Sequence, residues 1–153
     1  MRLTPDAVAS VLDAGERAFD VVVLDLPRAL DEVTDLALGR SQRTLLVTAA
    51  CVRGVAAAAR IGETLRERSS SLGVVVRRQP RGVSTEAVAS VLTDPVLGAV
   101  PYSSSLARRC DAGDGPALHD GYARAVRRLL PDVVGLPTAS SSSSVSSVRG
   151  RSA

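Results

Sequence analysis

The sequence predicts an α/β fold built on a parallel sheet of about four strands. Four short apolar runs, rich in Val and Leu, are continuous rather than alternating in hydrophobicity, which is typical of strands covered on both faces. Helical patterns separate these runs, so strands and helices alternate along the chain. The 153 residues include only one Phe, two Tyr and no Trp. The core must therefore be built from Val, Leu and Ala, within about one domain's worth of chain.

The predicted strands follow from the apolar runs, and the predicted helices from the segments between and after them. The strands are Phe19–Pro27, Arg43–Ala49, Leu72–Arg77 and Pro95–Pro101. The helices with apolar residues at helical spacing are Asp31–Leu38, Val52–Arg68 and Ala117–Leu130. Strands that alternate with helices in this way predict parallel pairing with crossover connections.

Two further helix starts share one pattern. Residues Thr4–Leu12 and Ser84–Leu92 each open with a hydroxyl residue and carry an acidic residue two positions later. A hydroxyl at the N-cap accepts a hydrogen bond from a free backbone N–H, and an acid in the first turn favours the helix dipole. We therefore expect a helix at each place, rather than a duplicated domain.

The chain divides into a domain over residues 1–136 and a tail over residues 137–153. Seven of the eight residues from Ser140 to Ser147 are serine, and such a composition cannot build a packed core. We expect the Ser/Arg-rich tail to be disordered. The start of the sequence lacks the apolar stretch of a secretory signal, and no run of about eighteen apolar residues occurs. We therefore expect a cytoplasmic protein that does not insert directly into a membrane.

The charged residues exclude one class of phosphate site. All nineteen basic residues are Arg, and the formal net charge is +3. Without Lys, the chain cannot supply a phosphate-binding loop that ends in Lys, and it cannot form a Schiff base. Sixteen acidic residues are available to pair with the arginines. For this reason we do not expect nucleic acid to be a partner.

Asp25 is the acidic residue with the most informative position. It ends the first predicted strand, and open α/β sheets bind ligands beyond the carboxyl ends of their strands. A carboxylate there can hold Mg²⁺ or its water shell, as in a Walker B element. An aspartate at this place can equally cap the following helix. Both interpretations stay open on this residue alone.

The order and spacing of four segments, between about Ala18 and Leu130, resemble the MinD/ParA-type P-loop ATPases. A D-x-P switch segment, a strand ending in N-R, a stretch ending in I-P-Y and a segment LA-x-A-x-x-x-G-x-P follow one another in that family. The residues at the first three motifs are Asp25 and Pro27, then Arg77 and Arg78, then Pro101 and Tyr102. The tetrapeptide DLPR and the run VVVR look most like the CpaE/TadZ-like branch and its actinobacterial septum-site-determining proteins.

This resemblance implies a partial Rossmann-like sheet in three layers, as in P-loop NTPases. It implies a role in septum-site determination or in positioning a pilus or secretion apparatus, with ATP and Mg²⁺ as the family's ligands. Asp25 would be the acid on the Mg²⁺ side, Pro27 and Arg28 the switch turn. The base-side wall would consist of Arg77, Arg78, Pro101 and Tyr102. The implied partners are proteins of the division or the secretion and pilus machinery, and a second copy of the chain in a homodimer.

The sequence also departs from the family pattern. No glycine-rich phosphate-binding loop precedes Asp25, so the Walker A strand of the family is missing. Arg77 stands where the family has the Asn that reads the adenine edge, and a guanidinium offers only donors. We expect that this chain alone neither binds nor hydrolyses ATP. We also expect an open sheet edge with uncovered apolar residues, whether the sequence is part of a longer protein or a degenerate family member.

Two other functions remain alternatives. A receiver-like signalling domain would use Asp25 as a phospho-acceptor and Thr48 as the switch residue, although the Lys of such domains is missing. A weak DNA-binding accessory protein would use surface arginines to contact phosphates.

Overall fold

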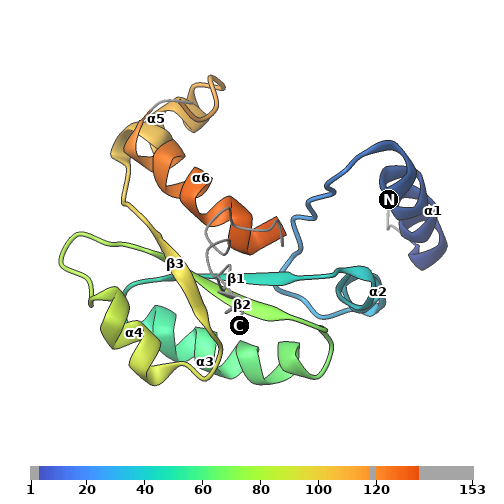
Figure 1. The fold of residues 1–153 in the computed structure, drawn as a ribbon, viewed down its shortest axis with the longest axis horizontal. Helices are drawn as coiled ribbons and strands as arrows, with labels where there is room; N and C mark the ends of the chain where they lie inside the picture. Colours follow the sequence, from blue (N-terminus) through green and yellow to red (C-terminus); the bar gives the residue numbers. More distant parts are fainter. Residues whose placement is uncertain (1–3, 118–119, 135–153) are drawn as a thin grey trace, which may run out of the picture.

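The computed structural model describes residues 4–117 and 120–134, and it has the predicted α/β architecture (Figure 1). Its three strands form one sheet in the order β1-β2-β3, and both pairings are parallel. In chain order the elements are α1 (Pro5–Ala18), α2 (Glu32–Arg40), β1 (Thr44–Ala49), α3 (Val52–Arg66), β2 (Leu72–Arg77), α4 (Thr85–Val91), β3 (Val96–Val100), α5 (Ser104–Asp111) and α6 (Gly121–Val134).

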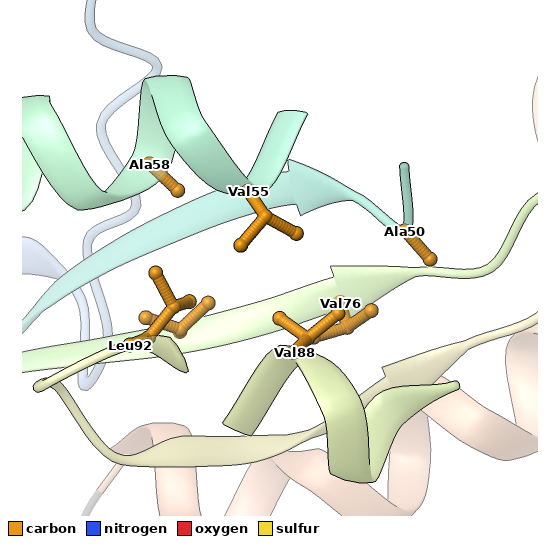
Figure 2. Packing of buried hydrophobic residues seen from close by; sticks show 7 residues of the cluster. Ala50, Val55, Ala58, Val76, Val88 and Leu92 are labelled. Carbon is orange, nitrogen blue, oxygen red and sulfur yellow. The ribbon is translucent and has the colours of Figure 1, made fainter. Parts of the chain in front are cut away.

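Helices cover the two faces of the sheet, which gives the three predicted layers. Helices α3 and α4 lie on one face, and α6 packs against β3 on the other (Figure 1). The core lies between β2 and helices α3 and α4 (Figure 2). It consists of Ala50, Val55, Ala58, Val74, Val76, Val88 and Leu92. Aliphatic side chains of this size fill the core without aromatic residues, as the composition predicts.

The predicted helix starts are confirmed by their caps. The Thr4 hydroxyl accepts a hydrogen bond from the backbone N–H of Ala7 at 3.4 Å, and α1 follows. The Ser84 hydroxyl accepts one from the N–H of Ala87 at 3.1 Å, and α4 follows. Each cap satisfies a backbone donor that the helix itself leaves free.

The first predicted strand, Phe19–Pro27, does not form. The segment is not paired with any described strand, and its residues are largely exposed, with Val23 exposed by 86%. A strand needs a neighbour for its N–H and C=O groups, and a run of apolar residues does not supply one. The prediction of a buried strand ending at Asp25 is therefore wrong. The receiver-like alternative loses its premise with it, because an acceptor carboxylate must sit at a strand end.

The same finding explains the open edge of the sheet. Strand β1 has β2 as its neighbour on one side and no described strand on the other. Val47 of β1 is 63% exposed, whereas Val75 opposite it in β2 is buried. The expected uncovered apolar surface at this edge is confirmed.

The end of the predicted domain cannot be compared with the structure. Leu118 of the predicted last helix, the boundary at residue 136 and the tail at 137–153 lie outside the described residues. Helix α6 begins at Gly121 and continues through Pro131 to Val134, beyond the predicted end at Leu130. Pro131 has no backbone N–H to donate to the carbonyl four residues earlier, so one intrahelical hydrogen bond is missing there.

Candidate functional site

The carboxyl ends of β2 and β3 meet at one edge of the sheet. Arg77 is the last residue of β2, and Pro101 directly follows the last residue of β3. The backbone N–H of Arg78 donates to the carbonyl of Val100 at 2.9 Å, and the N–H of Ala50 donates to the carbonyl of Arg77 at 2.9 Å. These bonds hold the three strand ends in register. Such an edge is where open α/β sheets bind their ligands.

A hollow of about 270 Å³ opens at this edge. Its walls come from the end of β2, the residues after β3, the first turn of α5 and the start of α6. The lining residues are Arg77, Pro101, Tyr102, Ser103, Leu106, Ala107 and Tyr122. Three residues of the predicted base-side wall, Arg77, Pro101 and Tyr102, therefore share one hollow.

The local structure around Tyr102 depends on the start of α5. The Ser103 hydroxyl caps this helix by accepting from the N–H of Leu106 at 3.1 Å, and it lies 2.9 Å from the Ser105 hydroxyl. The cap turns the chain directly after Tyr102, whose side chain remains 52% exposed. A ring that is half open to solvent next to apolar Leu106 and Ala107 can contact a ligand without losing its own packing.

Sequence reasoning missed Tyr122 as a residue of this hollow. Its spacing in the chain places it on the apolar face of α6, which is where a core residue would lie. The packing of α6 on β3 brings it to the hollow. The composition held one signal, since this sequence has only two tyrosines and both line the hollow.

Arg78 lies at a different place from Arg77. It lines a smaller hollow of about 190 Å³, next to Glu86 and other residues at the start of α4. Successive residues at the end of a strand point to opposite faces, so the two arginines of the predicted wall are separated. The structure therefore divides this pair between two hollows.

The remaining predicted site residues precede α2. Asp25, Pro27 and Arg28 are exposed, and neither hollow is lined by any of them. The structure thus does not bring the predicted metal-side acid together with Arg77, Pro101 and Tyr102 in one hollow. Among the described residues, no group of three or more His, Cys, Asp and Glu side chains is arranged to hold a metal ion. None of the described helices combines the length and apolarity needed to cross a bilayer.

The carboxylate of Glu86, next to the smaller hollow, has a perturbed pKa. Its own backbone N–H and the Ser84 hydroxyl donate to its carboxylate, and Arg78 lies nearby, so the pKa of Glu86 is lowered from its ordinary value. Because the carboxylate has a lower pKa in the folded protein than in the unfolded chain, its ionised form stabilises the fold. This stabilisation is fully present at pH values above the unfolded-state pKa, and it is lost as the pH falls through the native pKa.

The variant Glu86→Gln should therefore be less stable than the parent at neutral pH. The difference should shrink as the pH falls through the lowered native pKa of Glu86, because the parent carboxylate then becomes protonated. Urea unfolding followed by circular dichroism at both ends of this range measures the difference. An unchanged difference at acidic pH would show that the charge of Glu86 is not what stabilises the start of α4.

Comparison with known proteins gives similarities of two kinds, and no family model matches the sequence. Two curated relatives, uncharacterized proteins MT3760 and Rv3660c from two strains of Mycobacterium tuberculosis, are 37% identical over 107 residues. The match covers 69% of this chain and 31% of each relative. The chain thus spans less than a third of the length of the curated relatives that it matches.

Three solved structures share the fold over most of this chain. A ParA family ATPase from Chlorobium tepidum superposes with a TM-score of 0.73 at 14% identity, over 84% of this chain and 57% of that one. MinD from Pyrococcus horikoshii, complexed with Mg-ADP, gives 0.69 at 20% identity, over 84% and 56%. The MinC:MinD complex of Aquifex aeolicus gives 0.65 at 20% identity, over 82% and 57%. The described part of this chain therefore has the fold of the MinD/ParA-type ATPases.

Proposed function

We propose that this chain is the base-side and switch part of a MinD/ParA-like positioning protein. The process served would be septum-site determination or the placement of a pilus or secretion apparatus, as in the CpaE-like branch. The observation that carries the proposal is the meeting of Arg77, Pro101 and Tyr102 at one hollow. These residues come from two motifs more than twenty positions apart, and they line one space at the edge where this fold class binds ligands.

The proposed roles follow the place of each residue. Arg77, Pro101 and Tyr102 would form the wall on the base side, and Arg78 lines the second hollow. Asp25 would be the carboxylate on the Mg²⁺ side, and Pro27 and Arg28 the switch turn that leads into α2. The exposure of all three residues leaves them accessible for such a role.

A complete Mg²⁺–ATP complex does not fit the residues present. The chain contains no Lys to reach the phosphates, and Asp25 does not line the hollow that would take the base. Mg²⁺ in nucleotide sites usually has one or two carboxylates together with substrate phosphates as ligands. The proposed function therefore includes no catalytic step: the protein would position the septum or the apparatus by binding partners.

Protein partners are proposed for the exposed apolar residues. Phe19, Val21 and Val23 are exposed along the segment before α2, and Val47 is exposed on the edge strand. Exposed apolar side chains that lie together on a surface are typical of protein contacts, and the first three of these residues lie within five positions of one another. The structural similarity to MinD in its complex with MinC supports a protein partner, and a second copy of this chain is the other occupant that we propose.

A genetic experiment tests the proposed role. Deleting the gene that encodes this sequence should scatter septum positions along the cell, or move pili or secretion complexes away from their usual site. The parent gene should restore placement. The variant Tyr102→Ala should restore it poorly, because it removes an exposed ring of the hollow. Fluorescence microscopy of septa and of a labelled apparatus protein measures both outcomes.

A matched control separates the hollow from the protein as a whole. Val91 is 63% exposed at the end of α4 and does not line the hollow, so Val91→Ala should restore placement fully. Normal septa and normal apparatus placement in the deletion strain would overturn the proposed function.

A further inference from the structure

We propose that the hollow at the carboxyl edge of the sheet binds a guanine ring in preference to an adenine ring. The inference assigns a ligand class to the site of the proposed function and rests on it. Three properties of the hollow favour guanine: its size, its aromatic lining and the hydrogen-bonding character of Arg77.

The size of the hollow suits one nucleobase. Its volume is about 270 Å³, just below the range of roughly 300–1,000 Å³ that holds drug-sized ligands. Apolar residues Pro101, Leu106 and Ala107 contribute to the lining. A small and partly apolar space of this kind favours a single planar ring system over a larger ligand.

Aromatic residues line the hollow. Both tyrosines of the chain line the hollow, Tyr102 from the residues after β3 and Tyr122 from α6. Bases stack on tyrosine rings with little dependence on sequence, and a purine offers more stacking area than a pyrimidine. The two rings therefore favour a purine but do not choose between guanine and adenine.

Arg77 makes that choice. Its side chain is exposed and has no hydrogen bond or ion pair to another residue that the structure describes. A guanidinium presents paired donors in a fixed fork, which matches the neighbouring acceptors N7 and O6 of guanine. Adenine has its amino group beside N7, so one donor of the fork would face another donor.

The other lining residues do not offset this preference. None of them is a carboxylate or a carboxamide, the groups that accept a hydrogen bond from an exocyclic amino group most readily. The Ser103 hydroxyl already accepts from the backbone N–H of Leu106. Among the described lining residues, no side-chain carboxylate or carboxamide therefore stands beside Arg77 to accept from the amino group of adenine.

The test compares GMP, AMP and 7-deaza-GMP, which share the same phosphate. The chain has two tyrosines, one phenylalanine and no tryptophan, so its tyrosine proton resonances report the hollow directly. GMP should shift these resonances with a dissociation constant on the order of 1 mM. AMP should bind about fivefold more weakly or worse, as should 7-deaza-GMP, which lacks the N7 acceptor.

Two variants make the test specific to Arg77. Arg77→Gln should reverse the preference toward AMP, because a carboxamide pairs with N6 and N7 of adenine. Arg78→Gln, which changes the neighbouring arginine at the other hollow, should keep the preference for GMP. Circular dichroism checks that both variants are folded.

The results would overturn the inference in either of two cases. One is equal or tighter binding of AMP to the parent chain, and the other is no shift of the tyrosine resonances with any of the three nucleotides. Because binding is measured with the purified chain, its failure would leave the genetic result on septum and apparatus placement unaffected. A normal deletion strain with preserved GMP binding would instead overturn the proposed function alone.

Discussion

Replacing Arg66 by alanine is expected to destabilise the fold by about 3 kcal/mol. Asp94, two residues before β3, is only 8% exposed, and its Oδ1 lies 2.9 Å from Nε of Arg66 in α3. Arg66 is the residue that pairs with this carboxylate in the described part of the chain. Without the guanidinium, a buried charge is left uncompensated. Because Arg66 is itself 39% exposed, the expected loss lies at the low end for buried pairs.

Two further variants test the cause of this loss. Arg66→Ala combined with Asp94→Ala should recover part of the stability, because no unpaired buried charge remains. Arg60→Ala removes an exposed arginine from the same helix and should change the free energy of unfolding by less than about 0.5 kcal/mol. Urea unfolding measures all four proteins. An Arg66→Ala variant as stable as Arg60→Ala would show that the ion pair contributes nothing.

The elements with local causes could be predicted from the sequence. Strand β2 spans Leu72–Arg77, as predicted, because its unbroken apolar run is the local pattern of a strand that is buried on both faces. The caps of α1 and α4 depend on one hydroxyl side chain and a backbone N–H three residues later. Local bonds of this kind are present in the sequence pattern itself.

The elements that depend on distant partners could not be predicted. Phe19–Pro27 has the composition of a buried strand, but strand formation requires a neighbour that the described chain does not offer it. Helix α5 was not predicted, because its eight residues are too few for a clear apolar period, and its start depends on the Ser103 cap. A short helix of this kind forms because the rest of the fold holds its ends.

The candidate site likewise combines residues that the sequence pattern predicts with one that depends on distant packing. The sequence motifs placed Arg77, Pro101 and Tyr102 at strand ends, and parallel pairing brings them together. Tyr122 joins them through the packing of α6 on β3. This packing is close: a Cβ added to Gly98 of β3 would lie 2.5 Å from Cδ2 of Leu129 in α6. This helix–sheet contact has no signature in the motifs, so the motifs alone do not point to Tyr122.

Replacing Gly54 by alanine is expected to destabilise the fold by about 2–3 kcal/mol. In α3, a Cβ on Gly54 would overlap the carbonyl oxygen of Ala49 and would lie 3.2 Å from its carbonyl carbon. That oxygen already accepts a hydrogen bond from Cys51 at 2.8 Å. Both groups belong to the backbone at the end of β1, so neither can rotate away as a side chain could. The start of α3 must therefore move away from the sheet.

The control is a glycine in another helix with free space around it. A Cβ on Gly39 in α2 would meet nothing within 4 Å, so Gly39→Ala should stabilise the fold by about 0.5–1 kcal/mol. The two alanine variants should therefore shift the urea midpoint in opposite directions. Similar stabilisation by both substitutions would mean that α3 is not held against the end of β1. The close contact between α3 and the end of β1 would then be wrong, because a destabilising Gly54→Ala substitution is expected only if the added Cβ meets the backbone of Ala49.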